Sequence, residues 1–168
     1  DDDGVVDVTG VGGNINITVQ GTTQGAESAE NSVVLSGGSE IISDVCPACG
    51  SGGQISIRAE TLDLSGSDSN GQGSTIKSST AATVFDLNRD GVVDAEEALA
   101  ARGGDIVVEV QQLRVVDGAT ITSSTSNTDA GAAAGGNVIV RGLNGPDSQA
   151  TSVLLSSSNT GIVSDSTL

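Results

Sequence analysis

The sequence contains no histidine, methionine, tryptophan or tyrosine, and Phe85 is its only aromatic residue. A globular core usually depends on large aromatic side chains, so this composition disfavours a compact mixed core. A solenoid can fold without aromatics, because each coil buries a small ladder of aliphatic side chains against the next coil. The lack of histidine, tyrosine and aromatic platforms for sugar rings also counts against a carbohydrate-active enzyme.

Positive charge is also scarce, with 6 Lys and Arg residues against 22 Asp and Glu residues and a net charge of -16. Phosphate contacts need Lys and Arg, so nucleic acid and anionic membranes are disfavoured as partners. No apolar run approaches the roughly 18 residues needed to cross a bilayer, which argues against membrane insertion. No signal peptide is recognisable, and we expect a processed, secreted chain. The acidic balance fits a protein that binds divalent cations.

Repetition is the main feature that the sequence does have. Four segments begin with two glycines and continue with alternating apolar residues, starting near residues 12, 52, 103 and 135. A second short apolar stretch follows each start, and a third follows a glycine-rich turn. Three short strands per turn, separated by Gly, Ser and Asn corners, predict an all-β fold. We expect residues 1–168 to form one segment of a right-handed parallel β-helix (solenoid) of about four coils.

Alternation along the first strand of each repeat assigns side chains to the interior or the surface. Ile15 and Ile17 begin two expected interior columns, which continue through the equivalent positions of the later repeats. Two surface columns place opposite charges on neighbouring coils, which supports this register more than it supports stability. These columns are Thr18–Arg58–Glu109–Arg141 on the first strand and Asp63–Arg114 on the second.

The repeat pattern Gly-Gly-Asn-Ile-x-Ile, Leu-x-Leu and Gly-Ala-x-Ile-x-Ser resembles the repeats of filamentous-haemagglutinin-type adhesins, the large exoproteins of two-partner secretion. The resemblance runs from about Gly12 to the end of the chain. It implies a right-handed β-helix, passage through an outer-membrane exporter, and adhesion of a bacterial cell surface to a host or matrix surface. The chain departs from that pattern by carrying a calcium loop, and no functional residue of the family carries over.

The segment DLNRDGVVDAEE, residues 86–97, has the spacing of a calcium-binding loop. Oxygen-bearing side chains fall at loop positions 1, 3, 5, 9 and 12, and a glycine occupies position 6, where the chain must turn sharply. The loop resembles the single loops of EF-hand and dockerin-type proteins. We expect it, with a short following helix, to form an insertion over residues 85–102. The expected Ca²⁺ ligands are Asp86, Asn88, Asp90, the carbonyl of Val92, Asp94 and Glu97.

Residues 3–7 repeat the string DGVVD found at residues 90–94, so the chain is expected to begin inside a second such loop. Asp1, Asp3 and Asp7 would fall at positions 3, 5 and 9 of that loop. Position 12 would be Gly10, which has no side-chain ligand. We expect this second site to be weak or empty.

Cys46 and Cys49, in the string Cys-Pro-Ala-Cys, are the only cysteines. One chain without histidine cannot supply four zinc ligands from them, and a thioredoxin-like redox role needs an α/β context. We therefore expect a disulfide at a β-helix corner, and with it an oxidising, extracellular compartment. The closed loop is so short that the disulfide should stabilise little.

These observations favour a structural or adhesive extracellular protein over an enzyme. We expect a calcium-stabilised solenoid that belongs to a long surface adhesin or forms a filament by end-to-end stacking. Its partners would be neighbouring repeats of a longer chain or head-to-tail copies of itself. One alternative is a polysaccharide lyase-like enzyme using Arg58 and Arg141, and another is an ice-binding solenoid with a regular threonine array. The array would comprise Thr75, Thr120 and Thr122, but Glu40, Ile42 and Lys77 interrupt it.

Overall fold

The computed structural model describes residues 12–19, 31–44, 52–82, 102–127 and 135–167. These residues form ten strands and almost no helix, and every strand pair in the two sheets is parallel. The expected all-β class is therefore confirmed, with parallel sheets. The strands are β1 Ile15–Thr18, β2 Ser32–Ser36, β3 Glu40–Ile42, β4 Ile55–Ser65, β5 Thr75–Ala82, β6 Ile106–Val116, β7 Thr120–Asn127, β8 Val138–Arg141, β9 Ser152–Ser156 and β10 Gly161–Thr167.

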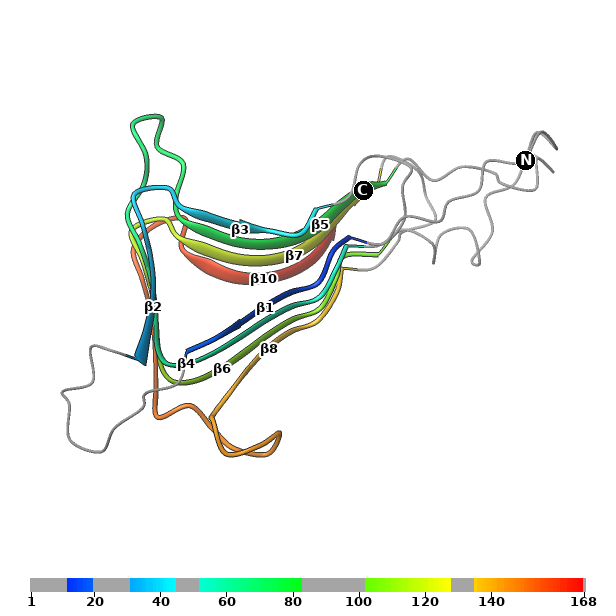
Figure 1. Ribbon diagram of the computed structural model, residues 1–168. Helices are drawn as coiled ribbons and strands as arrows, with labels where there is room; N and C mark the ends of the chain where they lie inside the picture. The colour runs from blue at the N-terminus through cyan, green and yellow to red at the C-terminus, as the bar shows by residue number, and fades with distance from the viewer. Residues whose placement is uncertain (1–11, 20–30, 45–51, 83–101, 128–134, 168) are drawn as a thin grey trace, which may run out of the picture.

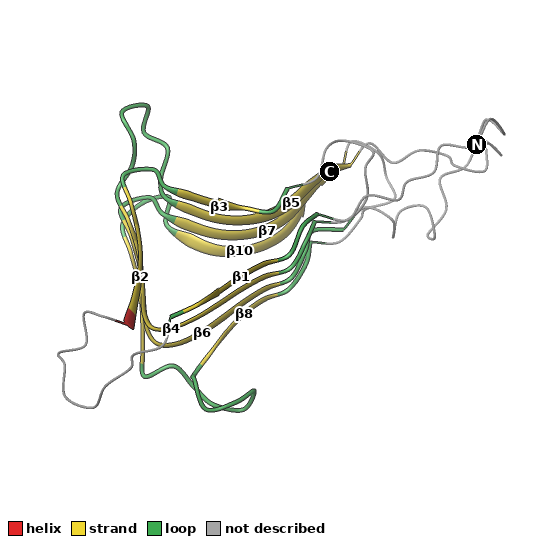
Figure 2. Cartoon of the chain, in the orientation of Figure 1, coloured by secondary structure: helices red, strands yellow, loops and turns green. Residues whose placement is uncertain are grey.

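The strands lie in four layers that follow one another along the chain (Figure 1). Layer 1 holds β1, β2 and β3, layer 2 holds β4 and β5, layer 3 holds β6 and β7, and layer 4 holds β8, β9 and β10. Each strand pairs with its counterpart in the next layer, in the orders β1-β4-β6-β8 and β3-β5-β7-β10, with β2 on β4 and β9 on β6. Figure 2 shows three walls: the first contains β1 and β8, the second contains β2, and the third contains β3, β5, β7 and β10. β9 belongs to the second wall, because it pairs with the second half of β6, as β2 pairs with the second half of β4.

In each inner layer a single long strand, β4 or β6, runs through both the first and the second wall. The sequence pattern predicted two short strands there. In β4 the alternation of buried and less buried residues breaks once, because Glu60 and Thr61 both lie outside the core. The extra outward residue turns the strand through the corner and keeps Ala59 and Leu62 buried on either side of it. β6 has the same break at residues 111–112. A corner of this kind needs no glycine or proline, so the pattern gave no turn signal.

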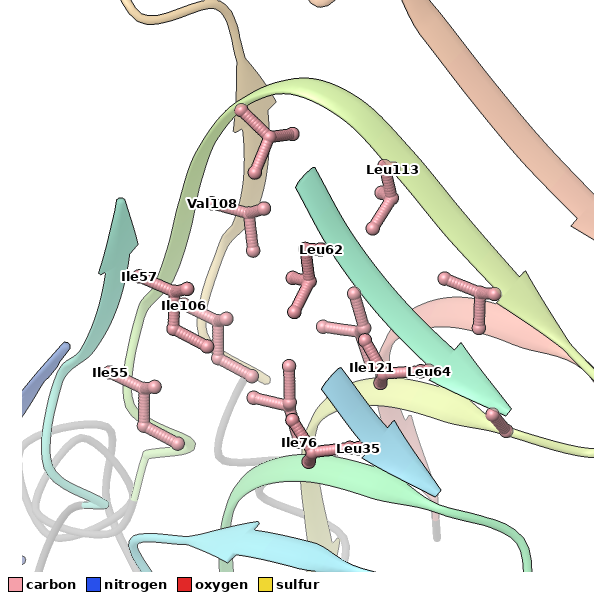
Figure 3. Close-up of a cluster of buried hydrophobic side chains, with 13 residues drawn as sticks. Leu35, Ile55, Ile57, Leu62, Leu64, Ile76, Ile106, Val108, Leu113 and Ile121 are labelled. Atoms are coloured by element: carbon pink, nitrogen blue, oxygen red, sulfur yellow. The ribbon is translucent and has the colours of Figure 1, made fainter. Parts of the chain in front are cut away.

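An aliphatic core fills the space between the walls (Figure 3). The expected interior columns that begin at Ile15 and Ile17 are confirmed by the strand register, and their members in layers 2 and 3 are fully buried. Burying an aliphatic side chain of this size stabilises a fold by about 1.5–3 kcal/mol. The two columns are Ile15–Ile55–Ile106–Val138 and Ile17–Ile57–Val108–Val140.

The corner between the second and third walls has a left-handed residue in every layer. Gly37, Gly66, Asp117 and Ser157 follow the paired ends of the second-wall strands, and their φ angles are 64°, 70°, 56° and 93°. Glycine adopts this conformation without a steric penalty, and aspartate tolerates it better than most residues. This column turns the chain sharply and brings the third wall back over the core.

Candidate functional site

The expected calcium ligands at residues 86–97 lie outside the described residues, as do Cys46, Cys49 and the acidic residues 1–7. The segment 83–101 links the end of β5 to the glycine pair that begins layer 3. Residues 45–51 and 128–134 make the equivalent links before layers 2 and 4. The described residues at the base of these links therefore form the candidate site. We call this base the Gly-Gly corner, which comprises residues 12–13, 52–53, 103–104 and 135–136.

The glycines of this corner stack backbone against backbone from one layer to the next. A Cβ atom on Gly53 would overlap the carbonyl oxygens of Gly12 and Gly13, and one on Gly104 would overlap the carbonyl oxygen of Gly53. A Cβ atom on Gly136 would overlap the carbonyl oxygen of Gly104 in the same way. Layers can approach this closely only where no side chain stands between them. The glycine pairs thus set the spacing of the layers at the base of the links.

A serine from the third wall closes each Gly-Gly corner. In every layer its hydroxyl donates a hydrogen bond to the carbonyl oxygen of the second glycine, which ties the third wall to the start of the same layer. Ser78 and Ser123 are fully buried, and Ser123 Oγ also accepts a hydrogen bond of 2.8 Å from Gly136 N. We call these four bonds the serine clasp. They join Ser43 to Gly13 (2.7 Å), Ser78 to Gly53 (2.7 Å), Ser123 to Gly104 (2.8 Å) and Ser164 to Gly136 (2.6 Å).

The serine clasp was missed in the sequence, although its signal is present there. Each third-wall segment has a serine two positions after an isoleucine, at Ser43, Ser78, Ser123 and Ser164. The chain is rich in serine, so this spacing alone does not identify the bonded serines until the strand register is known. The hydroxyls of all four serines face glycine carbonyls, and Ser43, Ser78 and Ser123 are buried.

A polar residue follows each glycine pair, and the side chains of Asn14 and Asp105 each accept a hydrogen bond from the next layer on the outside of the corner. Asn14 Oδ1 accepts a hydrogen bond of 2.9 Å from Gln54 N, and Asp105 Oδ1 accepts one of 2.8 Å from Asn137 N. A shallow depression of about 330 Å³ lies beside them, and within the described residues the exposed Arg102 side chain has no carboxylate partner there. Its lining residues are Gly52, Gln54, Arg102, Gly103, Gly104 and Asp105.

The expected surface column of opposite charges is confirmed as a ladder across three layers. Glu109 lies between two arginines, with 2.8 Å from Oε2 to Arg58 Nη1 and 2.7 Å from Oε1 to Arg141 Nη2. The hydrogen bond from Arg58 is the main cause that holds the pKa of Glu109 below its ordinary value; burial opposes this and Arg141 adds to it. Arg58 Nη2 also donates to the carbonyl of Leu143 at 2.7 Å, so both terminal nitrogens of its guanidinium have an acceptor.

In the described part of the chain, the second and third walls each have one ion pair between layers. Arg114 Nη1 lies 2.8 Å from Asp63 Oδ1, as expected from the sequence, and Lys77 Nζ lies 2.7 Å from Asp44 Oδ2. Within the described residues, no group of three or more cysteine, aspartate or glutamate side chains could hold a metal ion. The four ion pairs therefore connect neighbouring layers, and no carboxylate cluster in the described ranges is arranged to bind a metal ion.

One exposed loop, residues 66–73, projects from the corner between the second and third walls of layer 2 (Figure 1). Asp68 organises it by accepting hydrogen bonds of 2.8 Å from Gln72 N and from Asn70 N. The bond from Gln72 is the main cause that lowers the pKa of Asp68. The carboxylate is satisfied by its own loop, so this feature shapes the surface without forming a site.

The chain matches no protein family, no curated protein and no solved structure. Within the described ranges, none of the helical residues forms a helix long and apolar enough to cross a membrane.

Proposed function

We propose that this chain is a segment of a right-handed parallel β-helix in a structural or adhesive protein of a bacterial cell surface, braced by Ca²⁺ in the loop at residues 86–97. The observation that carries the proposal is the in-register stacking of four layers around an aliphatic core. In repeat folds of this kind each unit is stabilised by its neighbours, which gives a long, extended surface. Export through an outer-membrane exporter and attachment to a host or matrix surface belong to the same proposal.

Calcium would act at a link whose two ends are firmly held. On the layer 3 side of the link, Gly103 N donates to Thr125 Oγ1 at 3.0 Å, and Gly52 N donates to the carbonyl of Arg102 at 2.8 Å. On the layer 2 side, the buried Ser78 belongs to the serine clasp. A cation bound between these ends would restrict the long insertion without being needed for the core. Calcium-binding extracellular modules have dissociation constants of about 10⁻⁴–10⁻³ M, which is the range that we expect here.

The two alternative functions fit the described geometry less well. A lyase-like enzyme would use Arg58 and Arg141, but both guanidinium groups bind Glu109 in the ladder. An ice-binding face would need an unbroken threonine array. The register places Thr75 beside Thr120, with 3.0 Å between their Oγ1 atoms, but Glu40 and Gly161 occupy the outer positions of that column.

The proposal is tested by removing one calcium ligand and measuring binding by isothermal titration calorimetry. Asp90→Ala should weaken Ca²⁺ binding at least tenfold, because it removes the position-5 carboxylate of the loop. Asp147→Ala is the matched control, since it removes one exposed carboxylate outside the loop and should bind like the wild type. All three chains should keep the same β circular-dichroism spectrum. Hydrogen exchange should show calcium-dependent protection of residues 83–101 in the wild type and the control only.

Three results would contradict the proposal. One is unchanged calcium affinity in Asp90→Ala, and another is collapse of its β spectrum, which would mean that the loop is part of the core. The third is activity of the wild-type chain in one of the assays that belong to the alternatives, namely lyase activity on acidic polysaccharides or thermal hysteresis.

A further inference from the structure

Layer 4 exposes interior side chains along its outer edge, and the interior residues Ile15, Ile17 and Val33 of layer 1 are only partly buried. Val153 and Leu155 of β9 occupy the same interior columns as Leu113 and Val115 of β6. Their exposures are 49% and 48%, against 1% and 0% for the β6 residues. Within the described residues, no strand pairs with the outer edge of layer 1 or of layer 4. Both edges therefore offer unpaired backbone groups and aliphatic side chains.

The hydrogen-bonding groups at the two edges have complementary directions. The residue that begins each first-wall strand donates to the next layer: Ile15 N to Gln54 O, Ile55 N to Asp105 O, and Ile106 N to Asn137 O. By the same repeat, the N–H of Val138 in layer 4 is directed beyond the layer. Asn14, the layer 1 equivalent of the three acceptors, directs its carbonyl toward the opposite edge. Other groups donate in the opposite direction, as Thr75 N does to Ser39 O and Gly161 N to Ala119 O, so each edge presents both donors and acceptors. Two such edges of the same spacing can pair as parallel strands.

The outward side chains near the edges match as well. One second-wall column reads Val34, Asp63, Arg114 and Leu154 from layer 1 to layer 4, and one third-wall column reads Ile42, Lys77, Thr122 and Val163. Both columns are apolar only in the outer layers. The four outer residues are exposed by 63% (Val34), 47% (Leu154), 39% (Ile42) and 39% (Val163). If layer 4 met layer 1 of another copy, Leu154 would lie beside Val34 and Val163 beside Ile42.

Gly13 supplies an independent indication at the layer 1 edge. The equivalent glycines Gly53, Gly104 and Gly136 are required because a Cβ atom would overlap glycine carbonyls of the preceding layer. A Cβ atom on Gly13 would meet nothing within 4 Å, so no described neighbour requires a glycine there. A preceding layer of the same type would require it, because its glycine carbonyls would occupy that space.

We propose that layer 4 of one chain pairs in parallel and in register with layer 1 of a second copy, with Val138 beside Ile15 and Leu154 beside Val34. We call this contact the joint. The inference rests on the proposed solenoid function and specifies the partner and the strand register. The association is heterologous, because the layer 4 edge of one copy meets the layer 1 edge of the other. Such contacts do not close on themselves and therefore build linear assemblies.

The register is tested by cysteine cross-linking of the 168-residue chain with Cys46→Ser and Cys49→Ser. Val34→Cys and Leu154→Cys are made separately, mixed, and oxidised. Paired residues of neighbouring strands lie about 4.8 Å apart, within the reach of a disulfide. The mixture should form a cross-linked dimer that neither variant forms alone. Leu154→Cys mixed with Ile42→Cys is the control and should not cross-link, because those residues lie on different walls.

The proposed packing of a second copy against Gly13 is tested by sedimentation equilibrium over a range of chain concentrations. The wild type should form a ladder of masses, whereas Gly13→Ala should raise the dissociation constant of association at least tenfold without changing its β spectrum. Ser56→Ala, on the surface of layer 2, should associate like the wild type. The proposal is overturned by a monomer at every concentration, by a closed dimer, by cross-links between identical variants, or by normal association of Gly13→Ala. These outcomes leave calcium binding untouched, so they are distinguishable from a failure of the proposed function.

Discussion

The inner layers 2 and 3 and the outer layer 4 are built from the same repeat in the same register, yet their interior side chains differ in exposure. Leu62 and Leu113 are buried, whereas Val153 in the same column of layer 4 is exposed. The difference does not come from the residues, because every member of the column is aliphatic. Among the described residues, an inner layer has two neighbouring layers and layer 4 has one. Layer 1 also has one described neighbour, but its Leu35 is only 6% exposed, so the difference is clearest in layer 4. Burial in this fold is thus a property shared by adjacent layers.

The largest difference in stability between inner-layer and outer-layer variants is expected at the Gly-Gly corner. Gly104→Ala places a Cβ atom against the backbone of Gly53, which cannot move without shifting a whole layer. We expect a loss of more than about 4 kcal/mol of unfolding free energy, or failure to fold. Gly13→Ala should change the stability of the isolated chain by less than about 0.5 kcal/mol, because its surroundings are open. Urea unfolding followed by circular dichroism, at a chain concentration too low for association, measures both.

Equal unfolding midpoints for the two glycine variants would contradict the comparison. They would mean that the layers tolerate a side chain at the corner, and that the glycine pairs do not set the layer spacing.

A smaller difference is expected in the aliphatic column that contains Leu35, Leu64, Val115 and Leu155. Leu64→Ala leaves a cavity between two layers and should cost about 2–5 kcal/mol. Leu155→Ala removes a half-exposed side chain and should cost less than about 1 kcal/mol at low chain concentration. At a concentration where copies associate, the cost of Leu155→Ala should rise, because the proposed joint covers that side chain. If the cost of Leu155→Ala in unfolding free energy did not depend on chain concentration, the proposed joint would be contradicted. The comparison between inner and outer layers would still hold.

The sequence predicted the register of the layers because two signals agree on it. The glycine pairs mark the start of each repeat, and the period-two alternation decides which side chains face inward. The interior columns from Ile15 and Ile17 follow from these signals, as does the ladder of Arg58, Glu109 and Arg141, whose opposite charges repeat at the layer spacing.

The features that the sequence did not predict depend on contacts between distant residues. The continuous strand through Glu60 and Thr61 has no turn residue to mark it, and the serine clasp joins residues 19–30 positions apart. The calcium ligands at residues 86–97 and the disulfide between Cys46 and Cys49 stay predictions, since those residues lie outside the described part of the chain.

The smallest expected effect concerns Glu109, which links an inner layer to both of its neighbours. The arginine contacts hold its folded pKa below the ordinary value of 4.5. The ladder therefore contributes its full stability above about pH 4.5, and this contribution is lost as the pH falls through the lowered pKa. Glu109→Gln should reduce the difference in unfolding free energy between about pH 6 and about pH 3 by less than about 1 kcal/mol, since both arginines are partly exposed.

Asp147→Asn is the control for that measurement, because Asp147 is exposed and has no ion-pair partner within the described residues. Its unfolding free energy should follow the pH dependence of the wild type. Because Arg141 belongs to layer 4, Glu109→Gln should also increase hydrogen exchange of β8 more than that of β4, which is held from both sides. Equal exchange in β8 and β4 would mean that the ladder does not anchor the outer layer, and that its aliphatic contacts alone hold it in place.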